Sequence, residues 1–312
     1  MRPDRRFTLA GLFMLPVLGT ALRARAEAPA AGRLVEHPQT ASAHVQPRDV
    51  TVWLPPGYDA ADTRYPVLYM HDGQNLFDAS RAGYGKEWGI DEHVARLSAN
   101  GQIRLPIVVG VHNTPLRLRE YVPADMIRAL PSDIRADLLT LYGGEPLSDG
   151  YLRFLVEELK PFIDRTYRTR PGRDDTVIMG SSMGGLISLQ ALMKHPEVFG
   201  SAGCLSTHWP LRVERLDDNR LERWRETIVR TWSDVIARGL PDPSTHRLYF
   251  DRGDETLDQF YAFFQSRIDT VVTAGGWGPD RFRSLVFPGA EHNEASWNQR
   301  LDTPLTFLLP PG

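Results

Sequence analysis

Residues 176–185 read TVIMGSSMGG, and this stretch decides the fold. Its first four residues are β-branched or apolar, which is typical of a buried parallel strand. Behind the glycines, apolar residues at helical spacing continue to Pro196, where a helix has to stop. Ser182 is the centre of a Gly-x-Ser-x-Gly pattern, which Ser181 does not fit. The pattern predicts a strained turn that presents Ser182 as a nucleophile; the alternative is a Gly-Ser loop that only joins two elements.

Short apolar runs recur along the chain with helical patterns between them. Strands that alternate with helices predict the α/β class, with a mostly parallel sheet covered by helices on both faces. In such sheets the chemistry lies at the carboxyl ends of the strands. The charged stretch 213–238 interrupts the rhythm and predicts a small helical insertion over the site, with an ordinary crossover helix as the alternative. The runs are 50–54, 66–70, 107–111, 176–179, 203–205, 248–250 and 285–287.

The composition is that of a globular protein with one catalytic domain. The chain has 312 residues, of which 42% are hydrophobic, and this is enough to bury a full core. A net charge of −3 without long basic runs argues against a nucleic-acid partner. The single cysteine, Cys204, excludes an internal disulfide and a cysteine-based metal cluster, and it is expected to pack as a small apolar residue.

The N-terminus has the pattern of an export signal. Basic residues precede a mostly apolar stretch from Phe7 to Leu22, and a small-x-small cleavage site follows, so residues 1–26 are predicted to be a signal peptide. The apolar stretch is too short and mixed for a stable membrane span. Adjacent arginines favour twin-arginine export about as much as ordinary secretion. We therefore expect a periplasmic or secreted protein, with an unstructured lead-in at 27–47 and the catalytic domain at 48–312.

A serine nucleophile needs a base, an acid that orients the base, and donors for the oxyanion. His292 follows an apolar run through a turn, and of the histidines after Ser182 it has the most suitable setting. Four carboxylates between residues 251 and 258 are candidates for the acid, and composition does not choose among them. The backbone N–H of Met183 and the glycine-containing loop 71–75 are the expected oxyanion donors.

Five segments of the chain resemble the putative esterase branch of the α/β-hydrolase superfamily, which contains feruloyl and acetyl xylan esterases, siderophore esterases and mycolyltransferases. The segments occur in order from about residue 50 to the end: VLYMHDGQNLFD, IVVGVHNT with REY, ELKPFIDRTYRT, GSSMGG with PEVFG, and GAEHNEASW. The resemblance implies an α/β-hydrolase fold. It also implies Ser182 as the nucleophile, His292 as the base, and the amides of Gln74 and Met183 as the oxyanion hole.

The resemblance also bears on the acid. The segment GDETLD at 253–258 is similar to a GTxTLD form of the loop, which favours Asp258 as the acid and leaves Glu255 as the runner-up. The chain departs from that form because Asp254 follows Gly253 directly, and this departure keeps the assignment open.

The expected activity is that of an exported serine esterase on a small-molecule or carbohydrate ester, with no metal or organic cofactor. The ester is expected to be an acyl-sugar, feruloyl or siderophore type. The alternatives are an acyltransferase to a sugar or lipid, a non-catalytic carbohydrate- or siderophore-binding protein on the same scaffold, and a protease. Aromatic faces suit both sugars and aromatic acyl groups, although an aromatic side chain can equally belong to the core. The candidate pocket residues are Trp88, Tyr121, His208, Trp209 and Trp297.

Overall fold

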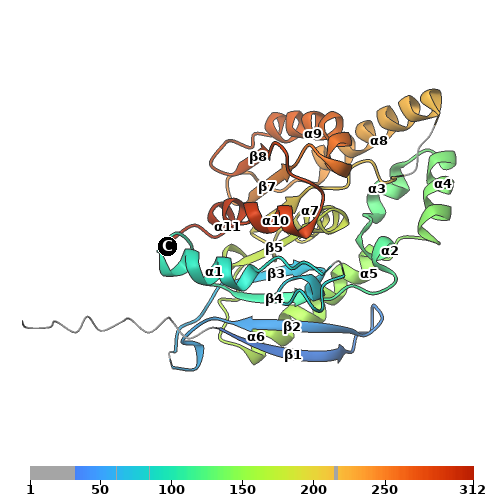
Figure 1. Ribbon diagram of the computed structural model, residues 1–312. Coiled ribbons are helices and arrows are strands. Elements are labelled where there is room, and N and C mark those ends of the chain that lie inside the picture. Colours follow the sequence, from blue (N-terminus) through green and yellow to red (C-terminus); the bar gives the residue numbers. More distant parts are fainter. Residues whose placement is uncertain (1–31, 61, 84, 214–216) are drawn as a thin grey trace, which may run out of the picture. The chain divides into compact units, whose positions relative to one another are not determined.

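The computed structural model describes residues 32–312 except 61, 84 and 214–216. Eight strands form one sheet in the order β1-β2-β4-β3-β5-β6-β7-β8, which Figure 1 shows from bottom to top. The strands from β4 through β3 to β8 pair in parallel, and β1 and β2 are antiparallel to their neighbours. The predicted mostly parallel sheet is confirmed. The strands are β1 (Arg33–Thr40), β2 (Arg48–Leu54), β3 (Val67–His71), β4 (Ile107–Val111), β5 (Thr176–Ser181), β6 (Ser201–Leu205), β7 (Arg247–Arg252) and β8 (Phe282–Val286).

Helices cover both faces of this sheet. Successive side chains of a strand point to opposite faces, so in β3 Val67 and Tyr69 enter one hydrophobic cluster while Leu68 and Met70 enter the other. Residues of α6 to α9 contribute to the first cluster, and residues of α1, α10 and α11 contribute to the second. The helices are α1 (Ile90–Ala99), α2 (Arg117–Tyr121), α3 (Ala124–Ala129), α4 (Ser132–Tyr142), α5 (Ser148–Arg153), α6 (Lys160–Thr166), α7 (Met183–Lys194), α8 (Asp218–Gly239), α9 (Ala262–Ala274), α10 (Glu294–Arg300) and α11 (Asp302–Leu308).

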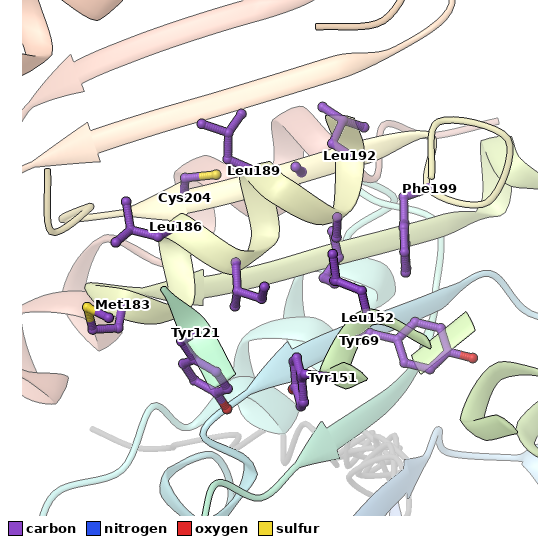
Figure 2. Close-up of a cluster of buried hydrophobic side chains, with 14 of the residues drawn as sticks. Tyr69, Tyr121, Tyr151, Leu152, Met183, Leu186, Leu189, Leu192, Phe199 and Cys204 are labelled. Atoms are coloured by element: carbon purple, nitrogen blue, oxygen red, sulfur yellow. The ribbon is translucent and has the colours of Figure 1, made fainter. Parts of the chain in front are cut away.

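Helix α7 is buried along nearly its whole length against β5 and β6. Figure 2 shows Leu186, Leu189 and Leu192 on this helix, with Cys204 of β6 beside them. Cys204 is fully buried, as expected for a small apolar residue. Because it packs on both strands, α7 fixes the turn that contains Ser182 firmly to the middle of the sheet.

Two sequence expectations need correction. Part of the expected lead-in is strand β1, which pairs with β2 and has a register irregularity between His37 and Thr40. Most of its side chains are exposed or half-buried because it lies at the sheet edge, so its sequence has no clear apolar alternation. The stretch 213–238 contains α8, which joins the parallel strands β6 and β7 and packs against α9, as a crossover helix does.

The predicted signal peptide, residues 1–26, lies outside the described residues. None of the helices in the described part of the chain is long and apolar enough to cross a membrane.

Candidate active site

Ser182 lies between the end of β5 and the start of α7, in a strained backbone conformation with φ 57° and ψ −120°. Its N–H donates to the carbonyl of Leu205 at 2.9 Å, which ties the turn to the neighbouring strand β6. A Cβ on Gly180 would lie 2.9 Å from the backbone of Gly184, and a Cβ on Gly185 would lie 2.7 Å from Thr207 Oγ1. The glycines therefore allow strand and helix to approach closely around the serine.

His292 and Asp258 come from the loops that follow β8 and β7. Nδ1 of His292 is 2.6 Å from Oδ1 of Asp258. The backbone N–H of His292 also donates to Thr256 Oγ1 at 2.8 Å, so the acid loop fixes both the backbone and the ring of the histidine. Glu255, the runner-up for the acid, is exposed, and no hydrogen bond connects its carboxylate with another residue of the described chain. The structure thus brings Asp258, rather than Glu255, to the histidine.

The carboxylate of Asp258 is buried and accepts several hydrogen bonds. Burial opposes its charge, but bonds from His292, Ser206 and the N–H of Gly253 outweigh burial and keep the pKa of Asp258 below its usual value. Ser206 Oγ donates to Asp258 Oδ2 at 2.5 Å, and the Gly253 N–H donates to the same oxygen at 2.6 Å. Asp258 is therefore ionised at neutral pH and orients the ring of His292.

Ser206 connects this carboxylate to helix α10. Its hydroxyl accepts from Trp297 Nε1 at 3.0 Å and from Arg300 Nη2 at 2.8 Å. Arg300 also forms a buried ion pair with Asp251, at 3.0 Å. Burial raises the pKa of Asp251, although Arg300 acts in the opposite direction. This network holds α10, and with it the loop of His292, against the ends of β6 and β7.

The expected oxyanion donors lie on both sides of Ser182. Met183 is the first residue of α7, and Gln74 is in the short helical turn Gly73–Asn75 that follows β3. Within the described part of the chain, the backbone N–H groups of Gln74 and Met183 donate to no other residue. Gln74 lines a cavity together with Ser182, and Met183 lines a second cavity that also reaches Ser182. Both amides are therefore free to donate to a ligand oxygen at the serine.

An ion pair supports the loop of Gln74. Asp72 has a left-handed conformation with φ 56°, and its carboxylate accepts from Arg117 Nε at 2.7 Å and Nη2 at 2.8 Å. Asn113 Nδ2 donates to the same carboxylate at 2.6 Å, and the Asn113 N–H donates to Gln74 Oε1 at 3.2 Å. Burial opposes the charge of Asp72, but Arg117 and Asn113 keep the pKa of Asp72 below its usual value. Arg117 and Asn113 thus hold the loop in place from the end of β4.

Ser182 and His292 both line a cavity of about 730 Å³. Trp88 and Trp297 also line it, with ring centroids 5.4 Å apart, but both are nearly fully buried and belong to a hydrophobic cluster, so their role in substrate binding stays a prediction. His208 lines two neighbouring pockets instead, one of which contains Ser182. Burial lowers the pKa of His208 to about 3, so its ring is neutral, and Nδ1 lies 2.7 Å from the hydroxyl of Tyr261.

Two expected pocket residues lie elsewhere. Tyr121 is fully buried beside Tyr151, as Figure 2 shows, and its hydroxyl is the acceptor for the Asp72 N–H at 3.4 Å. Trp209 is fully buried and packs edge-on against Trp232. Both are core residues, which was the alternative for aromatic residues in these loops.

Several residues around the cavity were not expected there by their side chains, although Asp72 and Asn75 lie in the expected oxyanion loop 71–75 and Glu294 lies in the segment GAEHNEASW. Asp72, Asn75, Lys86, Arg117 and Glu294 line the cavity. They come from four separate segments that neither spacing nor periodicity connects. Their positions after β3 and β4 or next to His292 agree with the rule that chemistry gathers at the carboxyl ends of parallel strands. Within residues 32–312, apart from the few positions not described, no three His, Cys, Asp or Glu side chains converge to hold a metal ion.

The strand order and the serine turn between β5 and α7 define the α/β-hydrolase class. Solved structures with the same fold include a ferulic acid esterase (TM-score 0.59, 19% identity, covering 89% of this chain and 97% of that one). Another is the enterochelin esterase from Shigella flexneri (TM-score 0.59, 16% identity, covering 90% of this chain and 59% of that one). Residues 42–308 match the family described as "Putative esterase", and the chain belongs to this family.

Curated relatives match about half of the chain. The uncharacterized protein YbbA of Bacillus subtilis (strain 168) is 30% identical over 164 residues, which are 52% of this chain and 58% of YbbA. The ferri-bacillibactin esterase BesA of the same organism is 28% identical over 163 residues, which are 49% of this chain and 52% of BesA. An endo-1,4-beta-xylanase/feruloyl esterase of Xylanibacter ruminicola is 28% identical over 169 residues, 52% of this chain and 20% of that protein.

Proposed function

We propose that this protein is a serine esterase that cleaves a carboxylic ester through an acyl-enzyme on Ser182. The observation that carries the proposal is the arrangement at one cavity. A serine on a strained strand-to-helix turn and His292 line the same cavity, and His292 Nδ1 contacts the buried carboxylate of Asp258 at 2.6 Å. Nucleophile, base and orienting acid are the three groups that acyl transfer requires.

The proposed mechanism follows from these contacts. The Nδ1–H of His292 donates a hydrogen bond to Asp258, so Nε2 carries the lone pair and removes the proton of Ser182. Ser182 then attacks the ester carbonyl, and the N–H groups of Gln74 and Met183 stabilise the oxyanion. His292 gives its proton to the leaving alcohol. Water, activated by the same histidine, releases the acid and restores Ser182.

The names of relatives and structural neighbours, a feruloyl esterase, a ferulic acid esterase, a ferri-bacillibactin esterase and an enterochelin esterase, support a feruloyl or siderophore ester as the substrate. The apolar second cavity at Ser182, about 190 Å³, fits the acyl group. Its walls include Leu118, Leu141, Leu211 and Leu257.

The test is hydrolysis of p-nitrophenyl acetate, p-nitrophenyl butyrate and methyl ferulate by the purified protein and by Ser182→Ala. We expect the variant to lose about a thousandfold or more in kcat, because Ser182 makes the covalent bond. Ser181→Ala is the matched control: it removes the adjacent hydroxyl, which has no role in the mechanism, and should retain most of the activity. Folded wild-type protein without turnover would contradict the proposal and favour the acyltransferase or binding-protein alternative.

We also propose that the protein is exported and cleaved after residue 26. The support is the basic and then apolar N-terminal sequence with its small-x-small site. N-terminal sequencing of protein recovered from the periplasm or medium measures the cleavage site. Substitution of Arg5 and Arg6 by lysine distinguishes the routes, since only twin-arginine export depends on that pair. An uncleaved chain that stays in the cytoplasm would contradict export.

A further inference from the structure

Glu294 is a carboxylate on the wall of the cavity at Ser182, and it forms no ion pair with a cation among the described residues. The residue is 5% exposed, lines the cavity and lies two positions after His292. Asn75 Nδ2 donates to its Oε1 at 3.2 Å, and its own backbone N–H is a second partner. No described Lys, Arg or His forms an ion pair with it. A carboxylate has about four acceptor positions, so Glu294 retains acceptor capacity toward the cavity.

The charges around Glu294 also favour a ligand that donates a hydrogen bond to its carboxylate. Burial raises the pKa of Glu294, and the negative charge of Asp72 raises it further, while His292 and Arg117 partly oppose them. A buried carboxylate in such surroundings is stabilised by a donor from a ligand. Asp72 differs because Arg117 and Asn113 already occupy its oxygens.

The position of Glu294 relates it to the alcohol portion of an ester. His292 must give its proton to the leaving oxygen, so the alcohol portion lies on the side of the serine where His292 is found. That side is the cavity of about 730 Å³, which contains both His292 and Glu294. The apolar cavity of about 190 Å³ is lined by Ser182 and Met183, and neither His292 nor Glu294 lines it. We therefore assign the acyl group to the apolar cavity and the alcohol to the cavity that His292 and Glu294 line.

The charges in the cavity favour a neutral donor. Arg117 pairs with Asp72, and the positively charged Lys86 also lines the cavity. A cationic alcohol such as choline would bring a second positive charge into this cavity, whereas a hydroxyl donates to Glu294 without an added charge. Asn75 and Asn113 supply further polar groups of the kind that bind hydroxyls.

We propose that Glu294 is a specificity-determining residue that accepts a hydrogen bond from a hydroxyl on the alcohol portion of the ester. The alcohol is then a polyol or a sugar. This inference rests on the proposed esterase function, since it assigns the two cavities at Ser182 from the proposed roles of His292 and the serine.

The experiment compares butyrate esters that share the acyl group and differ in the alcohol: propyl, 2-hydroxyethyl and 2,3-dihydroxypropyl butyrate, and butyrylcholine. The 2-hydroxyethyl and propyl esters have nearly the same size and differ mainly in one hydroxyl. We expect kcat/KM of the wild-type protein for the better hydroxylated ester to exceed that for the propyl ester by about 10- to 100-fold, the usual effect of a hydrogen bond to a charged group. In Glu294→Met, which has similar length but lacks the carboxylate, this ratio should fall close to one.

Two further variants exclude a structural explanation. If Glu294 only held Asn75 in place, Glu294→Met would lower kcat/KM for the propyl and hydroxylated esters by the same factor. Glu294→Gln retains one acceptor oxygen and should give an intermediate ratio, which also decides the question if the methionine variant does not fold. Glu291→Gln is the matched control, because Glu291 is exposed on the same loop and should keep the wild-type ratio.

The inference is overturned if the wild-type protein does not prefer the hydroxylated esters, if Glu294→Met keeps the wild-type ratio, or if butyrylcholine is the best substrate. Failure of the proposed function would give a different result, because Ser182→Ala would then hydrolyse these esters no more slowly than the wild-type protein, or neither protein would hydrolyse them.

Discussion

Removal of the Ser206 hydroxyl tests whether the network beneath the candidate triad stabilises the fold. In Ser206→Ala, the buried Trp297 N–H loses its acceptor and Asp258 loses one of its three donors. Arg300 keeps its ion pair with Asp251. An orphaned buried donor costs about 1–3 kcal/mol, and loss of a hydrogen bond to a charged group costs about 1.5–3 kcal/mol. We expect the free energy of unfolding to fall by about 3–5 kcal/mol.

The assay is urea denaturation at pH 7, followed by tryptophan fluorescence and linear extrapolation. The matched control is Ser266→Ala on α9, whose exposed hydroxyl donates to the Phe263 carbonyl, and it should change stability by about 0.5 kcal/mol or less. A loss below about 1 kcal/mol in Ser206→Ala would refute the reasoning, because it would mean that water or a shifted side chain replaces the hydroxyl.

The pH dependence of the stability loss separates the lost hydrogen bond to Asp258 from the orphaned N–H of Trp297. The pKa of Asp258 is below its ordinary value of about 3.9, so its contribution to stability is present above that pH and is lost as pH falls through the folded-state pKa. Without the Ser206 hydroxyl this pKa rises toward the unfolded value. The stability difference between wild type and Ser206→Ala should therefore be larger at neutral pH than below about pH 4.

Two other substitutions follow from the same site. Asp258→Asn should lower kcat by a factor of about 10⁴, because an amide does not fix the required tautomer of His292, whereas Glu255→Gln should change kcat less than about threefold. Steady-state kinetics on p-nitrophenyl butyrate measures both variants, and equal losses would exclude Asp258 as the acid. Ser182→Gly should have a free energy of unfolding about 1 kcal/mol higher than Ser182→Ala, since glycine adopts a positive φ without strain. Urea denaturation measures this difference, and an alanine variant of equal or higher stability would show that the turn stores no strain.

Much of the fold was accessible from the sequence because its strands are buried on both faces. Runs such as Ile107–Val111 and Thr176–Ser181 are continuously apolar or small, and each of their residues is buried. Strand β1 was not predicted from the sequence because most of its side chains face solvent and its sequence contains Pro38. Edge strands depend on pairing with a neighbour rather than on an apolar pattern, and pairing is not visible in the sequence alone.

The candidate site also contains residues that the sequence predicted and residues that it did not. Ser182 and His292 were accessible because a local pattern and the chain order point to them, and the resemblance favoured Asp258; their catalytic roles stay a proposal. Residue type did not distinguish Trp88, which is buried but lines the cavity, from Trp209, which is buried and does not line it. An aromatic side chain is equally suited to both places, and only three-dimensional packing decides.

The network that joins Ser206 to α10 also implies an order in which the parts of the proposed site are assembled during synthesis. Ser182 and the loop of Gln74 are synthesised before His292 and before Arg300, which anchors α10. The chain thus contains the proposed nucleophile before its proposed base has been made. On the proposed mechanism, the site can act on an ester only after α10 has docked against the ends of β6 and β7.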